Sequence, residues 1–509
     1  MAFSNFLPRL FHESGLQSVY TTGLDAWLII LNRCCRMFAY GASSLILAMF
    51  FAELQISDSR IGLFMTLTLL GDVFLSLILT LIADKVGRRR TLFAGSALMI
   101  MSGVIFALCE NYWVLLFAAI VGVISATGGD FGPFRAIEES TVSELTCRDT
   151  RNDVLVWYVT TASIGSALGT EVAGRVIEWL TEVEDGWSLL DAYHAVFWLY
   201  ALMGSVNMAS VLFLSDKCEL KGGNSTASTA VASSASSVVD GATGDETAPL
   251  LNNTDTVAET TVTPKHLAKP ALIKAPSSSC FLSPFKIISR ETLSVIVLLW
   301  VLLMIDSLAD GMTSSSLTTY FISTKFPELP KSRLGDMVST AYLFCSLGSP
   351  LAGPLARHIG LINTMVFTHI PSSAAVLFFP FPKTAGGTFG LLLLRMALNN
   401  MDQAPRAALI AAVVKPEERT AVMGITALLR TLSGSVGPSI TGLLAGGGRF
   451  GVAFVVAGAL RLVYDCGLWA IFVNVRLHKH EMAQDMESDE ADGGENGGAS
   501  GQQQPEVAV

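Results

Sequence analysis

The chain has 509 residues, of which 51% are hydrophobic and 15% are charged, and its formal net charge at pH 7 is −10. Soluble domains carry roughly a quarter charged residues, so this composition excludes a single soluble core and indicates an all-α membrane protein. Residues 477–509 hold eight acids against Lys479, which gives −7 of the net charge. Because the remainder is near balance, no nucleic-acid partner is expected.

Twelve stretches are apolar over about 20 residues, the length that a spanning helix needs. They are 25–53, 60–83, 91–109, 112–135, 153–180, 192–214, 292–322, 336–356, 361–381, 387–412, 421–445 and 450–475. The segment 216–289, rich in Ser, Thr, Ala and Gly, separates the first six from the last six and is expected to be disordered.

The pattern predicts five regions along the chain. They are an N-terminal segment 1–23, a six-helix bundle 24–215, a linker 216–289, a second six-helix bundle 290–476, and an acidic disordered tail 477–509.

Basic residues gather in alternate loops. Lys85, Arg88, Arg89 and Arg90 follow the second span, whereas the loops on the other side read ELQISDS and TEVEDGW, with 324–335 as the exception. Because short basic loops stay in the cytosol, we expect both termini and the linker to be cytosolic. The linker also holds ETAPLL, which resembles an acidic dileucine sorting signal, so the plasma membrane and the vacuolar or endolysosomal membrane both stay open.

The two sets of six spans contain similar motifs in the same order, offset by about 270 residues. FAYG (38–41) matches LADG (308–311), GDFGPFRA matches MDQAPRA, and GSALGTEVAG matches GSVGPSITG. Asp84-x-x-Gly87 likewise matches Arg357-x-x-Gly360. Such repeats indicate duplicated halves, and parallel halves with a substrate site between them are typical of secondary transporters.

The loop after the second span reads TLIADKVGRR and carries Asp84, Lys85, Gly87, Arg88 and Arg89. Together with the spans, the linker and the repeat, it resembles the loop between the second and third spans of the major facilitator superfamily (MFS), although a threonine replaces the leading glycine. AIEESTVSEL and MDQAPRAALIAAVVKPEERTA are similar to a little-characterised fungal and microbial group of that superfamily.

The resemblance implies the MFS fold, in which two six-helix bundles are related by a pseudo-two-fold axis. It also implies that the charged loop is a cytosolic gate motif. We expect Arg88 to pair with Glu138 or Glu139, and Asp84 to meet the start of span eleven near Thr420. The alternative is that the basic residues only hold the loop in the cytosol.

Ionisable residues inside spans are costly and therefore suggest function. The candidates for coupling or substrate contact are Asp72, Asp306, Asp310, Arg36, Tyr40, Asp130, Arg135, Arg395, Asp402 and Arg406. Asp306 is the first choice for a coupling carboxylate. Spans one and seven face each other in the family, so an Arg36–Asp306 pair is one expectation. The other is that Arg36 extends to the inner surface.

Several of these residues have two readings. Asp130 with Arg135, and Asp402 with Arg406, are either bridges at the inner gate or substrate contacts. Opposite charges four residues apart, Glu171/Arg175 and Arg461/Asp465, favour internally neutralised structural pairs. His369 is expected to be a hydrogen-bonding packing residue, and the alternative is that it titrates near neutral pH.

The chain has no Walker A sequence, no HExxH, no GxSxG and no Cys/His cluster. We therefore expect no transport driven by ATP, no enzyme activity, no cofactor and no metal. The sequence predicts a secondary active transporter of a small organic solute, working by alternating access as a proton-coupled monomer in a lipid bilayer. The alternatives are a facilitated uniporter for a sugar or organic acid, and a transporter-like nutrient receptor. A uniporter needs no titrating carboxylate inside a span, which is why the aspartates favour the first reading.

Overall fold

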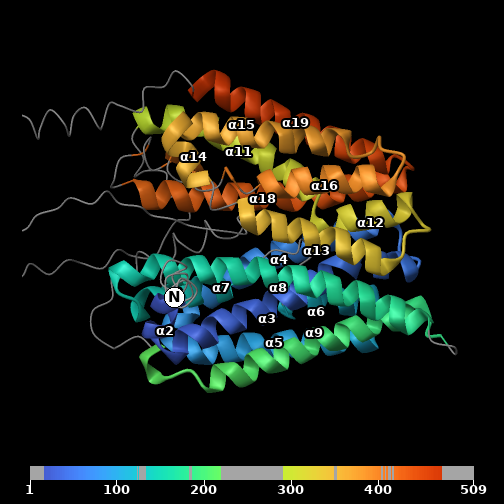
Figure 1. Ribbon diagram of the computed structural model, residues 1–509, viewed down its shortest axis with the longest axis horizontal. Coiled ribbons are helices and arrows are strands. Elements are labelled where there is room, and N and C mark those ends of the chain that lie inside the picture. The colour runs from blue at the N-terminus through green and yellow to red at the C-terminus, as the bar shows by residue number, and fades with distance from the viewer. Residues whose placement is uncertain are drawn as a thin grey trace, which may run out of the picture.

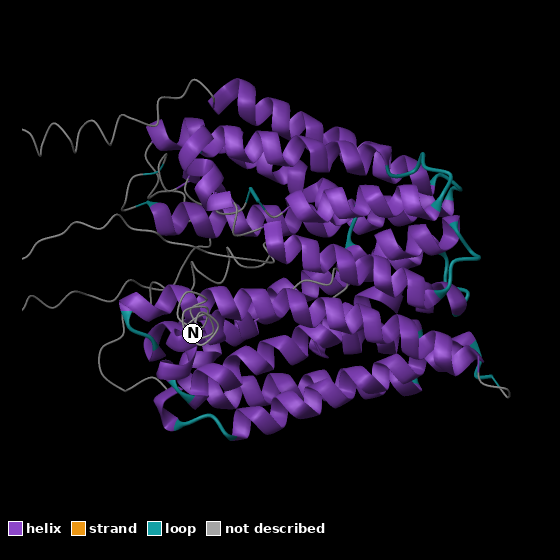
Figure 2. Cartoon of the chain, in the orientation of Figure 1, coloured by secondary structure: helices purple, strands orange, loops and turns teal. Residues whose placement is uncertain are grey.

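The computed structural model describes residues 16–122, 124, 133–182, 186–218, 290–348, 352–399, 401–402, 405–406, 409–410, 414 and 418–472. All regular structure in these ranges is helical, as predicted (Figure 2).

The helices form two bundles whose long axes run the same way (Figure 1). The first bundle contains α2 (Leu16–Thr22), α3 (Leu24–Glu53), α4 (Asp58–Val86), α5 (Arg88–Leu108), α6 (Tyr112–Gly122), α7 (Pro133–Leu145), α8 (Arg148–Glu182) and α9 (Leu189–Leu212), followed by a 3-10 turn at Asp216–Cys218. The second contains α11 (Arg290–Met312), α12 (Ser315–Lys325), α13 (Lys331–Gly348), α14 (Ala352–Ile359), α15 (Leu361–Phe378), α16 (Ala385–Asn399), α18 (Arg419–Gly446) and α19 (Phe450–Phe472).

The predicted spans coincide with these helices. Span 25–53 is α3, span 153–180 lies within α8, and span 292–322 is built from α11 and α12. The helices α6 and α13 cover the first, described part of spans 112–135 and 336–356. In the described part of the chain, five helices are long and apolar enough to cross a membrane, and α11 with α12 makes a sixth if this pair, bent by 44°, is one span.

The two ends of the molecule differ in how the bundles meet. We call the end with the N-terminus of α3 and the C-terminus of α19 the terminal end, and the opposite end, with the turns 54–57 and 326–330, the hairpin end (Figure 1). One apolar core at the hairpin end contains Phe50 and Phe64 of the first bundle with Phe321 and Phe454 of the second. Toward the terminal end the cores are separate, one in each bundle. The structure is therefore closed at the hairpin end.

Hydrogen bonds across the bundles lie on the hairpin side. Thr66 and Ser439 hydroxyls are 2.7 Å apart, and the Tyr320 hydroxyl donates to Asp58 at 2.7 Å. Here α4 packs along α18 and α8 packs along α13. These contacts hold the first and second bundles together near the hairpin turns.

Glycines let these helices approach closely. A Cβ atom added to Gly442 would lie 2.8 Å from the Cα atom of Gly62, and one added to Gly335 would lie 3.3 Å from the Cα atom of Gly174. Both pairs join the two bundles, so Gly174 of span five and Gly442 of span eleven serve the contact between halves.

The repeat is visible in the backbone. Gly87 and Gly360 precede α5 and α15 and have φ angles of 104° and 87°. Since side chains other than glycine rarely adopt this region, the equivalent loops of the two bundles use the same residue for the same turn.

A disulfide across the hairpin end is expected to block transport. In a Thr66→Cys/Ser439→Cys variant, oxidation should join the two sulfurs, because the native hydroxyls touch, and solute flux in proteoliposomes should fall to background and recover on reduction. Peptide mapping would verify the bond, and the single Thr66→Cys variant is the control. Normal flux through the cross-linked protein would show that this end need not open.

Candidate functional site

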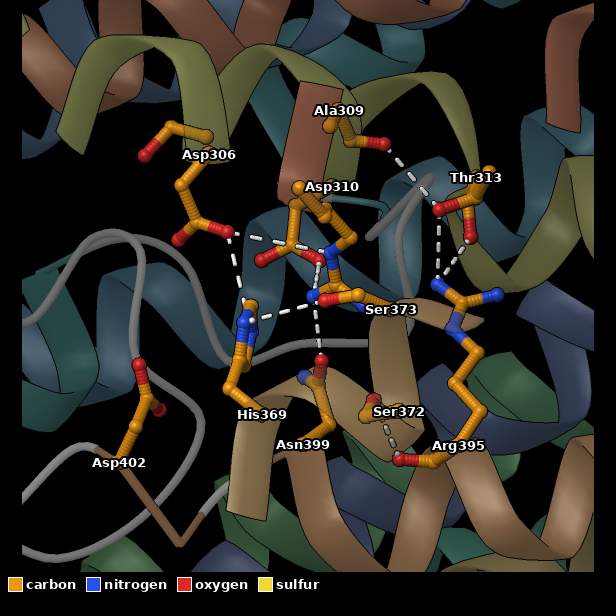
Figure 3. A network of polar contacts seen from close by, with 12 residues as sticks. Asp306, Ala309, Asp310, Thr313, His369, Ser372, Ser373, Arg395, Asn399 and Asp402 are labelled. Carbon is orange, nitrogen blue, oxygen red and sulfur yellow. Dashed lines mark hydrogen bonds and ion pairs between the residues drawn. The ribbon is translucent and has the colours of Figure 1, made fainter. Parts of the chain in front are cut away.

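Ionisable and polar side chains of the second bundle gather around the C-terminal part of α11 (Figure 3). We call this group the polar cluster. Its members are Asp306, Asp310, His369, Arg395, Asn399, Asp402, Arg406, Arg461 and Asp465. The structure thus brings together five predicted candidates from spans seven and ten, and adds His369, Asn399 and two residues of α19.

Asp306 is buried and held loosely. Its carboxylate oxygens have no hydrogen-bond partner among the described residues. Three basic groups lie at 3.8 Å from them: Nε2 of His369, Nη2 of Arg406 and Nε of Arg461. None of these groups is within hydrogen-bond distance of Asp306, so three longer contacts balance its charge instead of one fixed partner.

His369 lies between two carboxylates. Its Nδ1 is 2.7 Å from Asp465, which also accepts from the Ser373 hydroxyl at 2.7 Å. Its Nε2 faces Asp306 (Figure 3). A neutral imidazole has one N–H, so a neutral ring that donates to Asp465 presents a lone pair to Asp306. A second proton, on the ring or on Asp306, removes this conflict. The arrangement is therefore a place where a proton can bind.

Sequence reasoning favoured a hydrogen-bonding packing role for His369. Its ring is buried and hydrogen-bonded to Asp465, a partner 96 residues away on α19 that no local pattern reveals. The predicted Arg461/Asp465 pair was wrong, because Arg461 instead donates to Asp310 of α11 and to Asn399 of α16. The two side chains leave α19 toward different neighbours.

Arg406 and Asp402 form an ion pair one helical turn apart, and Arg406 also faces Asp306. Both lie in the cluster, so they connect this segment to α11. Their repeat mates differ. Arg135 donates to Glu139 at 2.6 Å within α7, and Asp130 lies outside the described residues.

Arg395 spans the break between α11 and α12. Its guanidinium donates to the carbonyl oxygen of Thr313 at 2.7 Å, to the hydroxyl of Thr313 at 2.9 Å and to the hydroxyl of Thr318 at 3.2 Å. A helix break frees backbone carbonyls that must be satisfied inside a membrane. Arg395, predicted as a substrate contact, therefore supports the bend in this structure.

The first bundle holds its own buried ion pair. Arg36 makes two hydrogen bonds to Glu138, at 2.9 and 2.6 Å, and the Tyr158 hydroxyl donates to Glu138 at 2.7 Å. The predicted pair of Arg36 with Asp306 was therefore wrong, because Glu138 offers a bidentate partner within the same bundle. The alternative, extension to the inner surface, was also wrong, since Arg36 is buried.

The gate motif is partly described. Arg88 makes two hydrogen bonds to Glu144, at 2.8 and 3.0 Å, and not to Glu138 or Glu139 as predicted. Glu144 comes six residues after Glu138 in α7, which places it about 9 Å farther along the helix. At that position it reaches Arg88, the first residue of α5.

The rest of the motif adds one further contact. Arg89 contacts Asp216 at 2.5 Å. The side chains of Asp84 and Lys85 in α4, and that of Thr420 in α18, lie outside the described residues, so their latch stays a prediction.

Two remaining candidates lie inside the first bundle. Asp72 of α4 is buried, and its oxygens have no hydrogen-bond partner among the described residues. Tyr40 stacks against Tyr200 with ring centroids 6.4 Å apart.

The predicted Glu171/Arg175 pair is confirmed at 2.5 Å, and Arg175 also contacts Asp336 of the second bundle at 3.1 Å.

The chain is similar to known membrane proteins over most of its length. It matches the sequence profile of the Major Facilitator Superfamily over residues 29–323 and 299–492. The uncharacterised membrane protein YJR124C of Saccharomyces cerevisiae is 32% identical over 452 residues, which are 89% of this chain and 94% of the yeast protein.

Solved structures share the fold at low identity. The nucleoside transporter NupG superposes with a TM-score of 0.62 at 12% identity, covering 88% of this chain and 98% of NupG. A bacterial homologue of the human drug peptide transporters PepT1 and PepT2 gives 0.61 at 13%, covering 89% and 98%. A bacterial homologue of the human lysosomal transporter Spinster gives 0.56 at 11%, covering 88% and 94%.

Proposed function

Because this chain belongs to the major facilitator superfamily of membrane transporters, we propose that it moves a small organic solute across its membrane by alternating access, coupled to protons. It is a multi-pass membrane protein and a transporter. The coupling, the solute and the orientation are the parts that we propose.

One observation carries the coupling. Asp306 and Asp465 approach the His369 ring from its two nitrogens, so the site accommodates one proton more than a neutral ring supplies. The ion contacts to Asp306 are long, at 3.8 Å, so a change of helix positions can alter which group balances its charge. A proton held in this way can be loaded from one side of the membrane and released to the other.

The closed hairpin end and the separate cores at the terminal end support one state of an alternating cycle. Basic loops at the terminal end favour a cytosolic position for it, so we take this state to face the cytosol. Arg88 and Glu144 both belong to the first bundle, so their bond does not join the halves. The latch to α18, through Asp84, would form only when the terminal end closes.

Proteoliposomes that contain a trapped pH-sensitive dye test the proposal. Nucleosides, peptides, amino acids, amines, organic acids and sugars would be added one at a time. At least one class should change the internal pH in vesicles with the protein and not in empty vesicles, and a protonophore should remove the effect. Solute entry that moves no protons and ignores a pH gradient would contradict coupling and favour the uniporter.

A further inference from the structure

Asp310 is the carboxylate of the polar cluster that solvent reaches most readily. Its side chain is 31% exposed, whereas Asp306, Asp465 and Arg461 are at most 1% exposed. An incoming solute therefore meets a negative group first. The positive partner of this group, Arg461, lies behind it.

Arg461 stands between two aspartates of α11. It donates to Asp310, and its Nε lies 3.8 Å from Asp306. Its Nε and Nη1 have no hydrogen-bond partner among the described residues. A guanidinium carries five N–H donors, so Arg461 has unused donors, and one of them, on Nε, lies near Asp306.

From these contacts we infer that the solute is an organic cation, such as an amine, and that it binds Asp310 in place of Arg461. The inference rests on the proposed proton coupling and gives it a direction. The solute and the proton are exchanged, one binding as the other leaves.

The exchange follows from the charges that face Asp306. These come from His369 on α15, Arg406 after α16, Arg461 on α19 and Asp310 on α11 itself. When a cation occupies Asp310, Arg461 is free to bond Asp306. A full positive charge at Asp306 makes the extra proton on Asp306 or His369 unnecessary, and it leaves to water. One positive charge enters the cluster and one leaves, so the buried charge is unchanged.

Other solute charges fit less well. An anion would have to reach Arg461, which is completely buried and already bonded to Asp310 and Asn399. A neutral solute gives Asp310 no charge with which to replace Arg461, so it would leave that carboxylate without a cationic partner.

Binding to the purified full-length protein in detergent tests this. The probes are amines and carboxylates with matched skeletons, namely benzylamine with benzoate, phenethylamine with 3-phenylpropanoate, and octylamine with octanoate. Melting temperature reports binding, and a dye in weakly buffered solution reports proton release. We expect at least one amine to stabilise the protein and release protons, while its matched acid does neither.

Variants connect the result to Asp310. Asp310→Asn should weaken amine binding by about thirtyfold or more, the effect of removing one partner of a desolvated charge pair. Asp310→Glu, which keeps the charge, should restore part of it. Asp191→Asn is the control, because Asp191 lies at the exposed start of α9. Melting of each variant without probe checks that it is folded.

Each contrary outcome overturns a stated part. Stabilisation by acids only, by no amine, or equally in Asp310→Asn would refute the cationic solute and leave proton coupling untouched. Amine binding without proton release would refute the exchange. Failure of the proposed function itself would be seen in a different experiment, as solute flux without proton movement in proteoliposomes.

Discussion

Asp306→Asn is expected to abolish accumulation of solute driven by a pH gradient, while passive exchange of solute continues. Asparagine keeps the shape of the side chain but cannot share a proton with His369 or balance Arg406 and Arg461. A gradient of one pH unit stores about 1.4 kcal/mol per proton, enough for roughly tenfold accumulation. In proteoliposomes with that gradient, the variant should bring solute only to equal concentrations inside and outside.

The control is Asp153→Asn, in which a carboxylate outside the polar cluster is neutralised. Asp153 accepts from Ser18 near the terminal end, and this variant should accumulate normally. If Asp306→Asn also accumulates normally, the coupling site is elsewhere, and Asp310→Asn and Asp72→Asn become the next tests. Normal accumulation in all three would support the uniporter.

The fold could be predicted from the sequence because the bilayer imposes a length and a polarity on each helix. Hydropathy located α3 and α15 nearly to the residue, and the repeated Gly87 and Gly360 turns marked equivalent positions in two halves. Those signals are local in the chain or periodic along it, so a single sequence contains them.

The partners of the charged residues could not be predicted in the same way. Periodicity says which face of a helix a residue occupies, but not which neighbouring helix faces it. Arg36 and Glu138 are 102 residues apart, and both were candidates that had been given other partners. The sequence thus singled out both charged residues, while their pairing depended on helix packing that no local pattern records.

In each bundle an ion contact joins corresponding helices, with the charges reversed. Arg36 of α3 meets Glu138 of α7, and Asp306 of α11 meets Arg406 after α16. The first pair is bidentate, with a closest approach of 2.6 Å, while the second is separated by 3.8 Å. This difference assigns a fixed bridge to the first bundle and an adjustable one to the second.

Breaking the fixed bridge should cost far more stability than breaking an exposed one. Glu138→Leu would leave Arg36 buried at 2% exposure without its carboxylate and would remove the acceptor of Tyr158. Removing one partner of a buried pair destabilises proteins by about 3–5 kcal/mol. The melting temperature in detergent should therefore fall markedly, and the yield of monodisperse protein should fall with it.

Two comparisons separate the lost charge balance from a general effect of mutation. The double variant Arg36→Leu/Glu138→Leu removes both charges and should recover most of the loss, because no unpaired ion stays buried. Asp216→Leu breaks the contact between Arg89 and Asp216, in which the Asp216 side chain is 97% exposed, and should leave the melting temperature almost unchanged. If Glu138→Leu melts no lower than Asp216→Leu, or if the double variant melts lower than Glu138→Leu, the bridge does not stabilise the first bundle. Its burial would then need a role in the transport cycle instead.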